Sequence, residues 1–279
     1  MCHDKEKTCV GEQRAEDVIA KMEKRKKRIK KLIRCVAYVL LVSIVFHVAV
    51  LPIAKRVIFI SKYGKEVYDI LGLVEEGAYI TFGHYEQDNN LENGQEEIEW
   101  LVLKVEEGRA LVISKYALDC QPYHTDHRKV TWDNCSLRTW LNREFLQTAF
   151  TPLEAAMIPR VTEKIEVEEE GVLMEYDKSL GRVFLWSIED EDDYPSFQRE
   201  DKKQCQATAY ARAQGARSRG GVVSWWLRDI DPGITGEQEN RVKCITYAGK
   251  EGSCGQGDHG IAVRPVLWID LKFLQSNIH

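Results

Sequence analysis

The chain has 279 residues, 44% hydrophobic and 9% aromatic, a composition that supports a packed interior and excludes wholesale disorder. Its net charge of −5 is unevenly divided, because residues 1–55 hold 13 Lys+Arg and 6 Asp+Glu, whereas the remainder holds 26 and 38. The larger part is therefore acidic and repels phosphate backbones, which excludes nucleic acid as its partner.

An apolar segment without formal charges, residues 35–54, follows a strongly basic stretch. Twenty residues at about 1.5 Å each span the roughly 30 Å hydrocarbon core of a bilayer, so a transmembrane helix is predicted. Residues 21–34 contain nine Lys or Arg, against four in the stretch after the span, and this imbalance predicts a cytoplasmic N-terminus. We expect a single-pass protein of the cell membrane with an uncleaved signal anchor.

Four parts are predicted along the chain. They are a cytoplasmic basic tail (1–34), a transmembrane helix (35–54), a stalk (55–76) and a compact extracellular domain (77–272).

The outer domain begins with three predicted strands, at 78–85, 97–105 and 109–116, which are rich in Tyr, Ile, Val, Trp and Phe. The last two are expected to form a hairpin that turns at Glu106–Gly108. The apolar period then changes to that of a helix over 136–150, and a short second helix follows at 152–157.

The second half of the outer domain reads as further strands and long loops. The predictions are an acidic protruding hairpin or loop at 162–181, a strand at 182–188, a short helix within 206–221, and strands at 222–227, 241–247 and 260–271. Antiparallel strands with few helices indicate the α+β class.

The order of six motifs, ITFGHYEQD, IEWLVLKVEEGRALVISKYALDCQPYH, TWDNCSLRTWLNREFLQTAF, VFLWSIED, SWWLRD and GIAVRPVLWI, resembles a family of uncharacterised surface domains of Gram-positive gut bacteria. The resemblance covers residues 77–269. That family is similar in turn to the C-type-lectin-like and sulfatase-modifying (formylglycine-generating) fold. This implies antiparallel strands, two main helices and long loops that display a ligand-binding surface, with the last strand in the central sheet. The catalytic cysteines of formylglycine-generating enzymes are not matched, so their activity is not carried over.

The stretch SWWLRDIDPG, residues 224–233, raises the main candidate site. On a strand, Trp225 and Trp226 point to opposite faces, so we expect one in the core and the other partly accessible near Arg228. The accessible indole would stack on a sugar ring or a peptide side chain, whereas a structural role for both is the alternative interpretation.

Charged residues around this stretch allow two further interpretations. Asp229 and Asp231, with Glu237 and Glu239, offer oxygen ligands to calcium, but they lack the regular spacing of a calcium loop, and a solvated loop explains them better. Arg264 lies within a predicted strand, and we expect it to be buried and paired with a carboxylate such as Asp229.

A second group of polar and aromatic residues precedes the first helix. His124 and His127 lie near Asp126 at a spacing suited to zinc, but no third ligand is apparent, and a polar loop explains them equally well. Tyr123 and Trp132 flank this group. The chain has no nucleophile elbow, phosphate-binding loop or dinucleotide fingerprint, so neither a cofactor nor a metal is predicted and no motif requires an enzyme.

The cysteines after the span leave two interpretations open. Pairing of Cys120 with Cys135, and of Cys244 with Cys254, would close short loops, while buried free thiols fit these positions, and Cys205, equally well.

These features predict a membrane-anchored extracellular domain that binds a glycan, a peptide or a protein partner, and whose other partner is the bilayer. The candidate ligand-binding residues are Trp225, Trp226, Arg228, Asp229, Asp231, Arg264, Trp132 and Tyr123. The alternatives are a membrane-tethered enzyme with a site around His124, Asp126 and His127, and a structural component of an envelope complex.

Overall fold

The computed structural model describes residues 3–50, 74–126, 128–169, 172–190, 194, 197, 200–231 and 241–273. The chain divides into two compact units, Met1–Lys65 and Glu66–His279. Most of the predicted stalk lies outside the described residues, as do the last four residues of the predicted span.

The first unit contains helix α1 (His3–Val45), which continues into a π-helical turn, η1 (Phe46–Val50). Within it, Lys24–Val48 is long and apolar enough to cross a membrane, with a mean hydropathy of 1.9 over a window that has none of its residues buried. Because apolar side chains without a protein cover favour another apolar phase, the helix is compatible with a transmembrane helix or a signal anchor.

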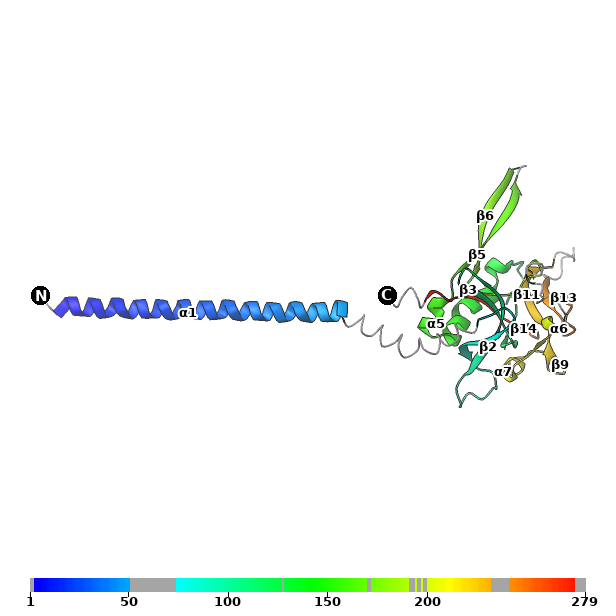
Figure 1. Ribbon diagram of the computed structural model, residues 1–279, viewed down its shortest axis with the longest axis horizontal. Coiled ribbons are helices and arrows are strands. Elements are labelled where there is room, and N and C mark those ends of the chain that lie inside the picture. The colour runs from blue at the N-terminus through cyan, green and yellow to red at the C-terminus, as the bar shows by residue number, and fades with distance from the viewer. Residues whose placement is uncertain are drawn as a thin grey trace. The chain divides into compact units, whose positions relative to one another are not determined.

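The second unit is a mixed α+β domain (Figure 1). Its strands are β1 (Tyr79–Tyr85), β2 (Glu96–Glu106), β3 (Arg109–Ser114), β4 (Asp119–Cys120), β5 (Val161–Glu169), β6 (Val172–Gly181), β7 (Val183–Phe184), β8 (Cys205–Gln206), β9 (Ser218–Arg219), β10 (Val222–Val223), β11 (Trp225–Ile230), β12 (Arg241–Ile245), β13 (Glu251–Gly255), β14 (Ala262–Val263) and β15 (Val266–Asp270). Its helical segments are η2 (Trp132–Asn134), α3 (Ser136–Trp140), η3 (Leu141–Phe145), α4 (Leu146–Ala149), α5 (Pro152–Met157), α6 (Glu200–Lys203) and α7 (Ala209–Ala213).

Two five-stranded sheets form the body of this domain. The first has the order β1-β2-β3-β15-β7, and the second has the order β13-β12-β11-β14-β4. Strands β8, β10 and β9 form a small third sheet, and β5 and β6 form a separate hairpin. Among the named strands that the structure describes, pairing is antiparallel except between β11 and β14.

The early predictions are confirmed in detail. Strands β2 and β3 form the expected hairpin, and its two turn residues, Glu107 and Gly108, both have positive φ, as a type I′ turn requires. Helical structure runs from Ser136 to Ala149 through α3, the π-helical η3 and α4. The second helix begins after Thr151, whose hydroxyl accepts from the Glu154 backbone N–H while the Glu154 carboxylate accepts from Thr151.

A β-bulge brings the end of β1 against these helices. The register between β1 and β2 shifts between Thr81 and His84, around Gly83, whose φ is +73°. A Cβ atom at this glycine would lie 2.6 Å from the Ala149 carbonyl oxygen and would also meet the Phe150 ring. Glycine is required here because both the positive φ and the close approach exclude a side chain.

The predicted last strand at 260–271 is divided between two sheets, because Ala262–Val263 forms β14 in the second sheet and only Val266–Asp270, which is β15, lies inside the first. β15 pairs with β3 on one side and β7 on the other. The chain reaches it from β14 of the second sheet through Arg264 and Pro265, and the Pro265 carbonyl accepts from the Ser114 N–H. The junction between the two sheets is therefore fixed by backbone hydrogen bonds.

The later part of the chain departs from the predictions in several places. The predicted strand at 222–227 is divided between β10 of the small third sheet and β11 of the second sheet. The predicted strand at 182–188 is short, with only Val183–Phe184 in the sheet. The sequence analysis did not predict β13, the edge strand beside β12, because Glu251–Gly255 is glycine-rich and lacks an alternating pattern. The acidic stretch forms the β5–β6 hairpin, which projects from the rest of the α+β domain (Figure 1).

Candidate functional site

Both tryptophans of SWWLRDIDPG are fully buried, so the prediction that one of them is partly accessible is wrong. Trp225 and Trp226 lie on β11 with no exposed surface. β11 is the middle strand of its sheet, and the domain covers it on both sides, so alternation places the two rings in two buried layers. The indole N–H of Trp225 donates to the Lys203 carbonyl at 2.9 Å, and that of Trp226 donates to the Gln121 carbonyl at 2.9 Å.

Arg228 is buried beside them and is held by carboxylates rather than open to a ligand. Its guanidinium donates to both oxygens of Asp190, at 2.6 and 2.8 Å, and to Glu163 at 2.7 Å. Burial lowers the pKa of Arg228, but these carboxylates outweigh it and raise the pKa overall. Because Glu163 lies on β5, this charge cluster anchors the base of the projecting hairpin to the sheet.

The two aspartates after Arg228 also have structural partners. Asp229 accepts from the Ser187 hydroxyl and from the Ile188 N–H, at 3.0 Å for the latter. The backbone N–H of Asp231 donates to the Arg241 carbonyl, which continues the β11–β12 pairing. Glu237 and Glu239, the other proposed calcium ligands, lie outside the described residues.

The remaining candidates of this group are core residues as well. The Tyr123 hydroxyl donates to the Arg228 carbonyl at 3.0 Å, and the Trp132 indole donates to the Leu180 carbonyl at 2.9 Å. Arg264 is buried as expected, but its predicted pairing with Asp229 is wrong. Its guanidinium packs over the rings of Phe197 and Trp225 and donates to the Ser114 carbonyl at the junction between the sheets.

The histidine loop uses its polar atoms within the fold. His124 lies 2.9 Å from Asp126 through Nε2, and its Nδ1 accepts from the Ser136 N–H at 3.1 Å. Because the Ser136 N–H donates to Nδ1, the neutral ring carries its hydrogen on Nε2, and both ring nitrogens have partners within the fold. Arg128 donates to Asp126 and lowers the pKa of its carboxyl. His127 lies outside the described residues.

A surface pocket that the sequence analysis did not identify lies where the loop between β1 and β2 meets two helices. Its volume is about 300 Å³. The lining residues come from three separate parts of the chain: Tyr85, Glu86, Leu91, Gly94 and Gln95 from β1 and the following loop, Thr148 from α4, and Tyr210 from α7. The bulge at Gly83 gives β1 the close approach to α4 that this pocket needs.

The wall of the pocket combines aromatic rings with negative charge. Tyr85 and Tyr210 meet edge to face, with their centroids 5.8 Å apart. Behind Tyr85, the buried Asp119 accepts from the Tyr85 hydroxyl at 2.5 Å and from the Cys120 N–H at 2.6 Å. The pKa of Tyr210 is raised by burial and further by the charges of Asp119 and Glu86, so the potential at the Tyr210 hydroxyl is negative.

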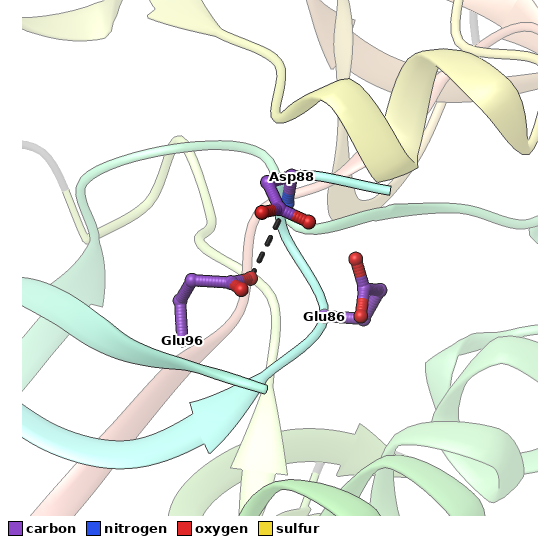
Figure 2. Close-up of side chains that lie close together, drawn as sticks. All are labelled: Glu86, Asp88 and Glu96. Carbon is purple, nitrogen blue, oxygen red and sulfur yellow. Dashed lines mark hydrogen bonds between the residues drawn. The ribbon is translucent and has the colours of Figure 1, made fainter. Parts of the chain in front are cut away.

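Glu86 belongs to an acidic cluster with Asp88 and Glu96, each of which offers one oxygen within 4.8 Å of the others (Figure 2). Hydrogen bonds from the loop account for several of these oxygens. Glu96 accepts from the Gln87 N–H at 2.7 Å and from the Asp88 N–H at 3.3 Å. Glu86 accepts from the Asn90 N–H at 2.9 Å. The carboxylates therefore shape the loop around its own N–H groups.

The electrostatics of the cluster differ from those around Arg228. In the part of the chain that the structure describes, none of the three carboxylates has a Lys, Arg or His partner within ion-pair distance, although Glu86 is only 6% exposed. The pKa of Asp88 is lowered by hydrogen bonds from Asn93 and Asn90, so its charge persists. The pocket therefore has an uncompensated negative edge.

The sequence held a signal for this pocket. Tyr85 and Glu86 lie in the motif HYEQDNNLENGQE, where an aromatic residue is followed by four acidic residues and three Asn within a short turn-rich stretch. From the sequence alone, residues 86–96 are only the connection between two predicted strands. The contributions of Thr148 and Tyr210 depend on tertiary packing and have no local signal.

A comparison with protein-family models finds one match, to a domain of unknown function (DUF6273) over residues 107–271. The chain belongs to the DUF6273 family. No curated protein and no solved structure matches it. The DUF6273 region contains β11, the Arg228 cluster, Thr148 and Tyr210, whereas Tyr85 and the acidic cluster precede it. Some residues that line the pocket therefore lie within the matched region, and others precede it.

Proposed function

We propose that the protein is a membrane-anchored binding module whose outer domain binds an ammonium-bearing ligand in the pocket between Tyr85 and Tyr210. The observation that carries the proposal is Glu86, a nearly buried carboxylate that lines the pocket and has no basic partner among the described residues.

An ammonium group suits this pocket for two physical reasons. A nearly buried carboxylate has lost much of its hydration, and a cation that enters beside it restores the lost interaction. An aromatic ring that lines the pocket, that of the partly exposed Tyr210, can add a cation–π attraction of about 0.5–2 kcal/mol. Asp119 behind Tyr85 strengthens the negative potential.

The size of the pocket limits the ligand. About 300 Å³ lies at the lower end of the range of roughly 300–1,000 Å³ for ligand sites. This volume suits an amino sugar or the side chain of a lysine in a peptide, which share the same primary ammonium. Both fall within the glycan and peptide classes expected from the sequence.

The fold and the location belong to the same proposal. A C-type-lectin-like fold is supported by the two helical segments between early and late strands, and by the position of β15 in the first sheet. The excess of basic residues before α1's apolar part supports a cytoplasmic N-terminus, and the proposal therefore includes a binding domain outside the cell.

The topology is tested by labelling intact cells with a membrane-impermeant thiol reagent. A cysteine introduced at the exposed Glu92 is expected to react, whereas Cys2 and Cys9 are expected to react only after lysis. Labelling of the tail in intact cells without labelling of the outer domain contradicts the orientation.

Binding is tested by calorimetric titration of the full chain in lipid nanodiscs. The probes are two matched pairs, glucosamine with N-acetylglucosamine, and a lysine tripeptide with its Nε-acetyl form. We expect at least one amine to bind at least tenfold more tightly than its acetylated partner, and the pair that shows this identifies the source of the ammonium group. Equal binding within both pairs, or no binding of either amine, contradicts the proposal.

A further inference from the structure

Two cysteines face each other across the β12–β13 pair in the second sheet. Cys244 lies opposite Gly252, and Cys254 lies opposite Val242. Because side chains two residues apart on a strand share a face, Cys244 and Cys254 are diagonal neighbours on the same face. The interaction between their thiols shifts the pKa of each. The sequence alone left this pair open between a bridge and two free thiols.

The two thiols differ in access and in acidity. Cys244 is buried, whereas Cys254 on the edge strand β13 is partly exposed. The hydrogen bond from the Cys244 thiol lowers the pKa of Cys254, and Arg241 and Arg217 act in the same direction against burial and Asp258. The same hydrogen bond, together with burial, raises the pKa of Cys244. Cys254 is therefore suited to be the attacking thiolate, and Cys244 is suited to react second.

We propose that Cys254 and Cys244 form a reversible disulfide by exchange with small-molecule disulfides. The Cys254 thiolate attacks one sulfur of the small disulfide, whose S–S bond breaks and releases one thiolate. The Cys244 thiol then gives up its proton, attacks the Cys254 sulfur of the mixed disulfide and releases the second small thiol. The two protein thiols are oxidised, and one small disulfide is reduced to two thiols.

The position of the pair in the sheet makes the bridge reversible. Diagonal neighbours are about 7–8 Å apart between Cα atoms, whereas a relaxed disulfide spans about 4.4–6.8 Å. Closing the bridge therefore requires β13 to shift toward β12. β13 is an edge strand with glycines at positions 252 and 255, so it can move without disturbing a further strand. The strain that remains favours reduction.

The other cysteines of the outer domain provide matched controls. Burial raises the pKa of Cys135 to about 11 and that of Cys120 to about 12, so both stay protonated at neutral pH. Cys205 is also buried, and its pKa is raised for the same reason. We expect these three thiols to exchange far more slowly than Cys254.

The test uses the full chain in nanodiscs, incubated with oxidised glutathione at neutral pH and then treated with N-ethylmaleimide. Trypsin cleaves after Lys243 and Lys250, so the two cysteines fall on separate peptides. Mass spectrometry is expected to find these peptides joined by a disulfide, and C135A is expected to behave like the wild type. Treatment with excess reduced glutathione should return both thiols.

Two variants keep the test decisive. C244A removes the second thiol, so Cys254 is expected to accumulate as the mixed disulfide with glutathione. C254S leaves Cys244 buried, and it is expected to stay unmodified. The proposal is overturned if Cys254 of the wild type reacts no faster than Cys135. It is also overturned if the wild type forms only the mixed disulfide with glutathione and no Cys244–Cys254 bridge. The bridge does not depend on the pocket, so its failure leaves the ligand proposal standing.

Discussion

Two regions of the α+β domain combine aromatic rings with charged side chains, and they use them differently. Around β11, Trp225 and Trp226 are buried and Arg228 is paired with Asp190 and Glu163. At the pocket beside β1, Tyr85 is also buried but lines a cavity that opens to the surface, and Glu86 has no basic partner among the described residues. In the first region the charge of Arg228 is neutralised by carboxylates of the fold. In the second region the Glu86 carboxylate is available to a cationic ligand.

The difference shows that residue type alone does not mark a binding site. A guanidinium with bidentate carboxylate partners is part of the framework, because a ligand would have to displace those partners. A buried carboxylate without a cation is a better indicator, because a ligand adds an interaction and breaks none. The predictions below test this distinction.

The largest effect is expected from truncating either tryptophan of β11. W225A and W226A should each lower the free energy of unfolding by about 3–5 kcal/mol, because each leaves a large cavity and unpairs a backbone carbonyl. Urea unfolding of the full chain, followed by fluorescence, measures this. If one variant loses less than about 1 kcal/mol, that ring is not core, and the contrast between the two regions weakens.

Removal of the buried cation is expected to cost nearly as much. R228A should destabilise the domain by about 3–5 kcal/mol, because Asp190 loses its partner inside the fold. The control is K243A, which removes a cation from the exposed pair with Glu251 and should change stability by less than about 1 kcal/mol. Equal effects of the two variants would show that Arg228 is not the anchor described above.

A smaller effect is expected at the bulge that forms the pocket. G83A introduces a Cβ against the Ala149 carbonyl at a positive φ and should cost about 1–3 kcal/mol beyond the backbone strain. G77A is the matched control, because it has a similar φ of +85° but nothing within 4 Å. We expect G83A to weaken amine binding as well. If both variants unfold at the same urea concentration, the close approach at Gly83 is not what positions β1.

The pH dependence of stability tests the protonation of Asp119, which lies behind Tyr85 in the pocket wall. Burial raises the pKa of Asp119 above its ordinary value, although hydrogen bonds from Tyr85, Cys120 and Gln121 oppose this. Folding therefore favours the protonated form of Asp119. The stability that this protonation adds is complete below the ordinary pKa of about 3.9 and is lost as the pH rises through the pKa of the folded state. Unfolding of wild type and D119N across this range should show the wild type losing stability relative to the variant as pH rises.

The sequence predicted those parts of the fold that depend on local patterns. Alternation located β1 to β3, and helical spacing located Ser136–Ala149. A turn at Glu106–Gly108 was predicted from its position between two strands, and Glu107 and Gly108 are its turn residues. β13 was missed because its two glycines remove the pattern that marks a strand. An element is predicted where its own residues show a regular pattern, and it is missed where they do not.

The candidate site was harder to predict because it depends on long-range packing. The motif SWWLRD drew the hypothesis to β11, but only the sheet order shows that both its faces are covered. Tyr210 meets Tyr85 through the packing of α7 against the loop after β1, more than a hundred residues earlier in the chain. No local pattern predicts such an encounter.

The most direct test of the central claim compares two variants of the same loop. E86Q removes the charge that lines the pocket and nearly keeps the shape of the side chain, whereas E92Q removes the same charge from an exposed position outside the pocket lining. Calorimetry with the preferred amine should show at least a tenfold loss of affinity for E86Q and no significant change for E92Q. Equal affinities of the two variants, with both folded, would contradict the assignment of Glu86 as the ligand's counter-charge.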